Sequence, residues 1–181
     1  MLIDRKNAVL VLIDVQENLT PVVSQPRAVI DGCARLARGA GLLKVPVVAT
    51  EQYPKGLGNT IFDVRRFLDG AAIVEKQSFS AFKEPSFVGA LEKTGKKQVV
   101  LAGIEAHVCV LQTAFDLKNA GYSPFVVIDA CSSRHAVDFE TAKNRLVAGN
   151  IPLVTTEMAL YEWLETAKAP EFKECHTHLL Y

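Results

Sequence analysis

The sequence predicts an open three-layer α/β/α sandwich around a six-stranded, mostly parallel sheet. Three observations lead to this fold class. Six short runs are too short for ordinary helices and too uniformly apolar for half-exposed strands, which is typical of parallel strands buried on both faces. Stretches with helical periodicity lie between several of these runs, and glycine or proline marks most of the joints. Strands that alternate with helices in this way indicate an α/β sandwich.

The apolar runs are the predicted strands. They cover residues 8–14, 45–50, 71–76, 98–103, 124–129 and 151–155. Pro46, Pro124 and Pro152 stand at or near the start of three of them, where a missing backbone N–H is tolerated. The strand order is left open, but the order 3-2-1-4-5-6 would place the first and fourth strands side by side.

The helical periodicity predicts helices over residues 27–43, 108–120, 137–148 and 157–167. In the first of these, Val29, Cys33 and Leu36 fall on one apolar stripe. Four glycines stand where a left-handed residue would end a helix, namely Gly41, Gly95, Gly121 and Gly149.

Residues 51–70 form a long irregular connection that contains Pro54, Gly56 and Gly58. Such connections are often functional loops. Nothing resembles a linker or a low-complexity segment. We therefore expect a single domain over residues 1–181, with a core at about 7–167 and a C-terminal tail at 168–181.

The charge balance argues against two classes of partner. The chain has 20 Lys plus Arg and 20 Asp plus Glu, so its formal net charge is zero. A large basic field for nucleic acid, or a polybasic patch for a membrane, is therefore not expected, although a local basic patch stays possible. A small-molecule substrate is the favoured partner.

The sequence contains no stretch near the roughly 18 consecutive apolar residues of a membrane span. Asp4, Arg5 and Lys6 stand where a signal peptide needs its apolar run. The four cysteines have no paired spacing, which fits reduced thiols. We expect a cytoplasmic protein.

Polar residues gather after the predicted strands, at the edge where open α/β sheets bind ligands. They include Asp14, Gln16, Thr50, Glu51, Gln52, Glu75, Lys76, Glu105, His107, Cys109, Asp129, Cys131, Ser132 and Ser133.

Three members of this set suit nucleophilic catalysis. Cys109 follows a strand at the start of a helix, so the helix N-terminus and a nearby Lys76 would lower its pKa. Asp14 would accept and later return the thiol proton. The residues alone leave ordinary alternatives open, because such a cysteine more often packs in the core, such an aspartate caps a helix, and such a lysine is solvated.

Three separated segments resemble the isochorismatase-like cysteine hydrolases. They are residues 12–16, LIDVQ, residues 75–82, EKQSFSAF, and residues 103–110, GIEAHVCV. The loop at residues 50–58 is most similar to the branch of uncharacterised isochorismatase domain-containing proteins, and the resemblance extends from about Asn7 to Trp163. It implies a Rossmann-like fold and a hydrolase activity.

The resemblance also implies a mechanism. Asp14, Lys76 and Cys109 would form a catalytic triad that cleaves a small amide-like or related substrate through a thioester-type intermediate. The backbone N–H groups of Glu105 and Cys109 would form the oxyanion hole, with a cis peptide between Ile104 and Glu105. The alternatives are a catalytically inactive family scaffold that binds a small molecule or a protein, and a thiol-redox role for Cys109.

The chain departs from its relatives in ways that affect cofactor and substrate. Nicotinamidases of this family carry an Asp-x-His metal motif after the second strand, but here that region has no histidine. No metal and no organic cofactor are expected. Cys109 points away from the vinyl-ether cleavage of isochorismatases proper, and Glu105 and His107 stand where many relatives have other residues.

Six residues are candidates to line the substrate pocket: Gln16, Gln52, Tyr53, Phe79, Phe82 and His107. For Phe79 and Phe82 a core position is an equal alternative, and for His107 a surface or interface position. Cys33 and Cys131 are expected to pack in the core. The Cys-His-Thr-His sequence at 175–178 is interpreted as part of the tail rather than as a zinc site. Homo-oligomerisation is expected from the resemblance.

Overall fold

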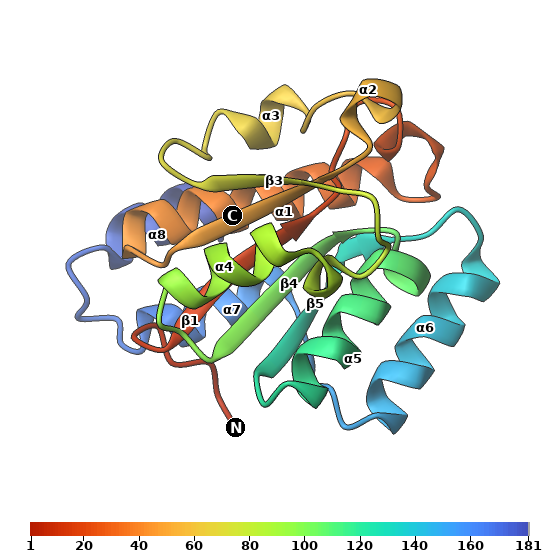
Figure 1. Cartoon of the computed structure of the whole chain (residues 1–181). Coiled ribbons are helices and arrows are strands. Elements are labelled where there is room, and N and C mark those ends of the chain that lie inside the picture. Colours follow the sequence, from red (N-terminus) through yellow and green to blue (C-terminus); the bar gives the residue numbers. More distant parts are fainter. Residues whose placement is uncertain (181) are drawn as a thin grey trace.

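A computed structural model describes residues 1–180 and contains a six-stranded sheet in which every neighbouring pair is parallel (Figure 1). The order across the sheet is β3-β2-β1-β4-β5-β6. The strands are β1 (Ala8–Ile13), β2 (Val47–Gln52), β3 (Ala72–Lys76), β4 (Gln98–Ile104), β5 (Ser123–Ser132) and β6 (Leu153–Val154). The predicted fold class is confirmed, and the sheet is wholly parallel.

Helices cover both faces of the sheet (Figure 1). One face carries α1 (Pro26–Leu43), α7 (Thr156–Leu164) and α8 (Phe172–Leu179). The other face carries α4 (Pro85–Lys93), α5 (Leu111–Asn119) and α6 (Ala136–Ala148). The remaining short elements are η1 (Thr20–Val22), α2 (Pro54–Leu57), α3 (Phe62–Arg65), η2 (Ala81–Lys83) and η3 (Ala106–Val110).

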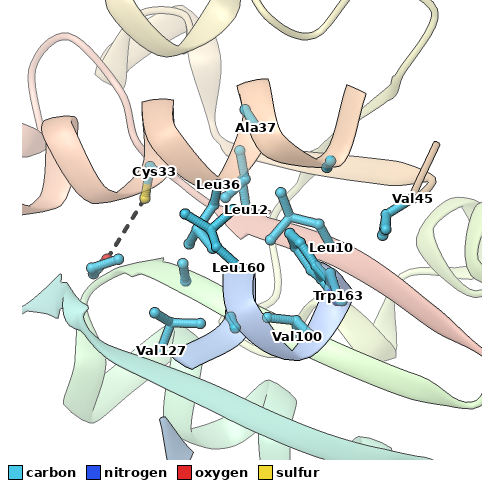
Figure 2. Packing of buried hydrophobic residues seen from close by; sticks show 14 of the residues in the cluster. Leu10, Leu12, Cys33, Leu36, Ala37, Val45, Val100, Val127, Leu160 and Trp163 are labelled. Carbon is cyan, nitrogen blue, oxygen red and sulfur yellow. Dashed lines mark hydrogen bonds between the residues drawn. The ribbon is translucent and has the colours of Figure 1, made fainter. Parts of the chain in front are cut away.

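The core divides at the sheet because successive strand residues face opposite sides. Leu10 and Leu12 of β1 pack against α1 and α7, where Leu36 and Trp163 are fully buried (Figure 2). Val9, Val11 and Ile13 join the cluster under α4, α5 and α6. Every residue of β1 is buried, which is why this strand appears in the sequence as an uninterrupted apolar run.

Two predicted helix ends are wrong. Gly41 lies inside α1, and the left-handed residue that ends this helix is Lys44 (φ 59°). After α6 the left-handed residue is Asn150 (φ 52°) rather than Gly149. Asparagine tolerates the left-handed region better than most residues. At the end of α1 the left-handed position is taken by Lys44, although Gly41 lies only three residues before it.

Three elements differ from the sequence-based prediction. Helix α4 was not predicted, because only Phe87 and Leu91 of its nine residues are buried. Strand β6 has two residues instead of the predicted five. The predicted tail contains helix α8, whose Cys175 and Leu179 are buried in the core cluster that includes α1. Tyr181, the last residue of that tail, lies outside the described residues.

Gly103 allows the carboxyl ends of β1 and β4 to come together. It pairs with Ile13 in register and has φ 121°, which a residue with a side chain rarely adopts. A Cβ atom there would overlap the main-chain carbonyl of Ile13. The glycine therefore sets the close approach of the two strands after which Asp14 and Cys109 stand.

Within residues 1–180, none of the helices combines the length and the apolar character that a membrane crossing requires.

Candidate active site

The candidate site lies where the winding of the sheet changes direction, between β1 and β4. Strand β1 has neighbours on both sides, and the chain connections leave it in opposite directions. The carboxyl edge at such a point is where open α/β sheets bind ligands. Asp14 follows β1 directly, Lys76 is the last residue of β3, and Cys109 lies in η3, just after β4.

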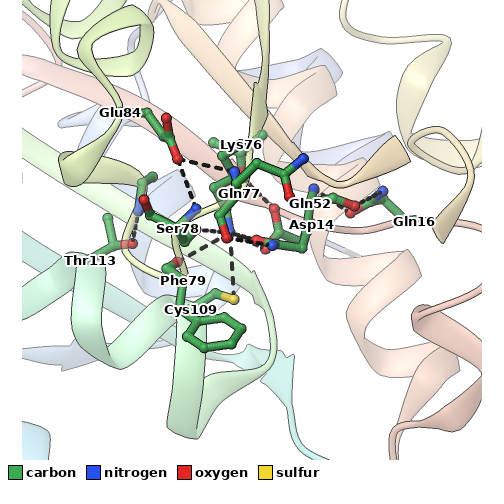
Figure 3. Close-up of polar contacts among 12 residues, drawn as sticks. Asp14, Gln16, Gln52, Lys76, Gln77, Ser78, Phe79, Glu84, Cys109 and Thr113 are labelled. Carbon is green, nitrogen blue, oxygen red and sulfur yellow. Dashed lines mark hydrogen bonds and ion pairs between the residues drawn. The ribbon is translucent and has the colours of Figure 1, made fainter. Parts of the chain in front are cut away.

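The structure brings these three side chains together (Figure 3). Lys76 Nζ lies 2.8 Å from Asp14 Oδ2 and 3.6 Å from Cys109 Sγ. The Asp14 and Lys76 side chains have no exposed surface, whereas Cys109 is 6% exposed. The lysine side chain spans the width of β2 to reach Asp14. The thiol is therefore the member of the set that meets solvent.

Asp14 is held by its own backbone and by the neighbouring strand. It adopts a left-handed conformation (φ 52°), which aspartate tolerates better than most residues. Its N–H donates to the carbonyl of Thr50 at 3.1 Å. The Thr50 hydroxyl donates to Asp14 Oδ1 at 2.7 Å. One carboxylate oxygen thus accepts from Thr50 while the other faces Lys76.

Lys76 is surrounded by acceptors. Besides its ion pair with Asp14, its ammonium donates to Gln52 Oε1 at 2.6 Å. It also donates to the carbonyls of Phe79 at 3.1 Å and Ser78 at 3.2 Å. These carbonyls belong to the turn after β3, so the backbone itself wraps around the ammonium group.

That turn is fixed from two sides. Glu84 accepts from the N–H groups of Ser78 at 2.8 Å and Gln77 at 3.0 Å. These hydrogen bonds hold the pKa of Glu84 below its usual range. The Thr113 hydroxyl of α5 accepts from the Ala81 N–H at 2.9 Å. The carbonyl groups that face Lys76 are thus positioned by a carboxylate and a hydroxyl outside the triad.

Burial controls the electrostatics of the site. It raises the pKa of Asp14, and the Lys76 charge and the hydrogen bonds to the carboxylate oppose this only in part. Burial also raises the pKa of the Cys109 thiol to about 12, with the Asp14 charge acting in the same direction and Lys76 against it. The predicted low pKa of Cys109 is therefore wrong for this geometry. Burial thus favours the neutral thiol and also increases the proton affinity of the neighbouring carboxylate.

The turn that carries Cys109 is tied to the loop after β5. The Ile104–Glu105 peptide bond is cis, and residues 106–110 form a π-helical turn before α5. The Glu105 side chain, 7% exposed, accepts from Arg134 Nε at 3.1 Å and Arg134 N at 3.2 Å. His107 also ties the turn to this loop, because its Nδ1 lies 2.9 Å from Ser133 Oγ. Glu105 and His107, the residues on either side of Ala106, thus both connect the turn to the loop after β5.

The six pocket candidates divide into inner and outer residues. Gln16 and Gln52 hydrogen-bond within the protein, Gln16 being fully buried. Tyr53 and Phe79 are 50% and 56% exposed, so a core position for Phe79 is wrong. Phe82 packs partly against the core, edge-on to the Tyr122 ring. His107 is partly buried beside Ser133.

The remaining cysteines and the nicotinamidase-type metal region have structural contacts. Cys33 and Cys131 are buried in the two core clusters. Glu51 accepts from the Thr60 N–H at 2.7 Å, the Thr60 hydroxyl at 2.8 Å and Arg65 Nη1 at 3.3 Å, which fastens the loop after β2. Among residues 1–180, no group of three or more His, Cys, Asp or Glu side chains is placed to hold a metal ion.

Comparison with known proteins decides the family. A family model described as the isochorismatase domain matches residues 8–158. The chain belongs to the isochorismatase domain family. Isochorismatase domain-containing protein 2 of Danio rerio is 40% identical over 170 residues, which are 93% of this chain and 85% of that protein.

Two solved structures share the fold over almost the whole chain. The MAR1 ribonuclease of Caenorhabditis elegans has a TM-score of 0.94 and 35% identity, covering 100% of this chain and 93% of that one. The YcaC gene product of Escherichia coli, described as an octameric hydrolase of unknown specificity, has a TM-score of 0.89 and 22% identity. The match covers 98% of this chain and 95% of the YcaC chain. At this identity it shows that the two proteins have the same fold.

Sequence reasoning missed several residues that hold the site. Arg134, Glu84 and Thr113 contact the site only through the folded loops. Thr50 was noted at a strand end, but its bond to Asp14 depends on the parallel register of β1 and β2. Of these four residues, Thr50 and Arg134 stand near strand ends, and that position was the signal that the sequence offered.

Proposed function

We propose that this isochorismatase domain is a cysteine hydrolase that cleaves a small amide-like substrate through a thioester intermediate. The supporting observation is the convergence of Asp14, Lys76 and Cys109 from three strand ends into one buried cluster. A nucleophile, a proton acceptor and a fixed cation within contact distance are the groups that acyl transfer to sulfur requires.

The first half-reaction starts from the neutral thiol. Asp14 accepts the Cys109 proton as the sulfur attacks the carbonyl carbon, so that a C–S bond forms and the carbonyl electrons move to oxygen. The Lys76 ammonium stabilises the developing thiolate at 3.6 Å. The C–N bond then breaks, and Asp14 returns the proton to the departing amine. The product on the protein is a thioester at Cys109.

In the second half-reaction water is the nucleophile and Cys109 is the leaving group. Asp14 takes a proton from water as the water oxygen attacks the thioester carbon. The C–S bond breaks, the carboxylic acid leaves, and the proton on Asp14 returns to the Cys109 sulfur. Because burial raises the pKa of Asp14, the carboxylate holds this proton more readily than an exposed aspartate would.

The backbone N–H groups of Glu105 and Cys109 are the proposed oxyanion donors. They belong to the turn that Arg134 and Ser133 hold from the loop after β5. Rigid donors at such a position contribute about 3 kcal/mol each to the transition state of acyl transfer. Tyr53 and Phe79, both exposed, together with His107 are proposed to line the outer part of the pocket.

We propose that the reaction uses no metal and no organic cofactor. The three site residues balance both half-reactions by themselves. Glu51, at the end of β2, spends a single carboxylate oxygen on three hydrogen bonds that fasten its loop, a structural role.

We also propose that the chain forms a homo-oligomer, as the Escherichia coli YcaC protein does. Val137 and Val147 of α6, and Met158 and Tyr161 of α7, are large and exposed. The tail does not offer its apolar side for this purpose, because Cys175 is buried within the chain. Light scattering after size exclusion should give a multiple of 19.8 kDa.

All four cysteines are free, which supports the expectation of a reducing compartment such as the cytoplasm.

The proposed activity is tested with a panel of small aliphatic and aromatic amides. Because the Caenorhabditis elegans relative is named a ribonuclease, a short RNA is included as a separate arm. We expect release of amine and acid by the wild-type chain and none by Cys109→Ala. RNA cleavage that survives Cys109→Ala would overturn the proposal, and binding without turnover by either chain would favour the inactive scaffold.

A further inference from the structure

We propose that Gln52 is a positioning residue, which fixes the Lys76 ammonium beside Cys109 through an uncharged acceptor. The proposal rests on the cysteine hydrolase mechanism above, and it assigns Gln52 to the lysine rather than to the substrate. Gln52 and Lys76 are register partners in β2 and β3, so their side chains leave the same face of the sheet.

The distances around the ammonium single out Gln52. The contact from Lys76 Nζ to Gln52 Oε1 is 2.6 Å, shorter than the 2.8 Å contact to Asp14. An ammonium has three hydrogens to donate. Gln52 Oε1, the two carbonyls of the turn after β3 and Cys109 Sγ are the acceptors around these hydrogens, and Asp14 adds an ion pair. Together they confine the ammonium 3.6 Å from the sulfur.

Gln52 is itself immobilised at several points (Figure 3). Its side-chain Nε2 donates to the carbonyl of Gln77 at 2.9 Å. This bond determines which end of the amide faces the lysine. Its main-chain N–H donates to Gln16 Oε1 at 2.7 Å, and its carbonyl accepts from Gln16 Nε2 at 3.0 Å.

Gln16 extends this chain of contacts to the loop after β2. Its Nε2 also donates to the carbonyl of Gly58 at 2.7 Å. Gln16 is fully buried, and a buried amide with satisfied hydrogen bonds specifies one arrangement of its neighbours. Two glutamines thus connect the loop at residues 53–61 to the catalytic lysine.

The absence of charge on Gln52 matters for the chemistry. Asp14 already opposes thiolate formation at Cys109, and Lys76 favours it. A second carboxylate on the ammonium would cancel more of the positive charge that the thiolate needs. An amide oxygen holds the ammonium in place and leaves that charge available.

A double-mutant cycle tests the coupling of Gln52 to Lys76. The probe is iodoacetamide, and the readout is the rate of Cys109 alkylation at one fixed pH below its pKa, located by peptide mass. We expect Lys76→Met to slow alkylation about ten-fold or more in the wild-type chain. In the Gln52→Leu background the same change should slow it less than about two-fold, because the lysine has lost its shortest contact and no longer stays beside the sulfur.

The outcomes separate the two proposals. If Lys76→Met leaves the alkylation rate unchanged in the wild-type chain, the cysteine hydrolase mechanism loses its cation and the proposed function fails. If Lys76→Met acts equally strongly in both backgrounds, only the positioning role of Gln52 is overturned. Gln112→Leu, an exposed glutamine on α5, is the matched control and should change neither rate.

Gln52→Glu provides a second test that leaves Lys76 in place. It keeps an oxygen acceptor at the same position and adds a negative charge. We expect Cys109 alkylation at the same fixed pH to be slower than in the wild-type chain, with the far-ultraviolet circular dichroism unchanged. An unchanged rate in a folded Gln52→Glu variant would overturn the inference.

Discussion

The two ends of the sheet bury polar groups of different kinds. At the amino end the buried polar side chain is Gln98, which accepts from the Asp4 N–H at 2.6 Å and donates to the Leu2 carbonyl at 3.0 Å. At the carboxyl end the buried polar side chains include Asp14, Gln16, Thr50, Glu51, Lys76, Glu105, Ser132 and Ser133. A neutral amide with ordinary partners stands at one end, and ionisable groups stand among neutral ones at the other.

The difference suggests an explanation for the ionisable groups at the carboxyl end: they lower the stability of the fold, and the proposed reaction needs them. A buried ion pair is often less favourable than well-packed apolar residues of similar size. Burial raises the pKa of Asp14 and of Cys109 despite the neighbouring lysine, so both groups are destabilised in their charged forms. Nothing comparable is found at Gln98. The proposed function accounts for this difference, because groups that exchange protons are needed at the carboxyl end only.

The largest expected effect is on turnover. Cys109→Ala removes the nucleophile, so hydrolysis should fall at least about a thousand-fold. The melting temperature should change little, because the substitution removes only one sulfur atom, at a position that still touches solvent. Rates and thermal melts of the two purified chains check this. Residual turnover near the wild-type level would break the contrast between the two ends.

Asp14→Asn should change reactivity and turnover in opposite directions. The Asp14 charge raises the pKa of Cys109, so the variant thiol should ionise at lower pH than the wild-type thiol. Hydrolysis should nevertheless fall about 10²- to 10⁴-fold, because the proton acceptor is gone. Alkylation and hydrolysis are measured across the same pH range. A parallel change in both would contradict the assigned role of Asp14.

Replacing the whole ion pair should cost less stability than breaking it. Lys76→Met alone leaves a buried carboxylate without its cation and should cost about 3–5 kcal/mol. Asp14→Leu combined with Lys76→Met should recover most of that loss. Urea unfolding of the wild-type, single and double variants measures it. A double variant as unstable as the single one would show that the pair stabilises the fold.

The same double variant sharpens the pH dependence. Because the folded-state pKa of Asp14 is raised from 3.8, the folded chain binds more protons than the unfolded chain above that pH. The stabilisation from protonated Asp14 is fully present below pH 3.8 and is lost as the pH rises through the raised pKa. We therefore expect the wild-type chain to lose stability relative to the double variant as the pH rises. Urea unfolding of both chains at a series of acidic to neutral pH values measures this.

The smallest expected effect belongs to the amino end. Gln98→Leu leaves the Asp4 N–H and the Leu2 carbonyl without their partner and should cost about 1–3 kcal/mol. The apparent pKa of Cys109 should stay at its wild-type value, because Gln98 lies at the opposite end of β4. Urea unfolding and alkylation measure both. A change in Cys109 reactivity would show that the two ends are not independent.

Most of the strands could be predicted because their residues are apolar on both faces. Helices α4 and α8 could not, since each has only two buried residues, Phe87 and Leu91 in one and Cys175 and Leu179 in the other. A tertiary contact of two side chains leaves little periodicity in the sequence.

The site was predictable to the level of its motifs. Asp14, Lys76 and Cys109 stand in segments that resemble one family, but the sequence gives no indication that burial outweighs the lysine at Cys109. The residues that support the triad meet it only across strands or loops, as Arg134 meets Glu105. Such partners follow from the register and the loop paths, which a single sequence does not contain.

The central claim is a covalent intermediate on Cys109. The most direct measurement mixes the chain with p-nitrophenyl acetate, an activated acyl donor, and follows intact mass and peptide mass after an acid quench. The account predicts one acetyl group per chain on the Cys109 peptide, formed with a burst of nitrophenol and absent in Cys109→Ala. Nitrophenol release at the same rate from both chains, with no acetyl group on Cys109, would contradict it.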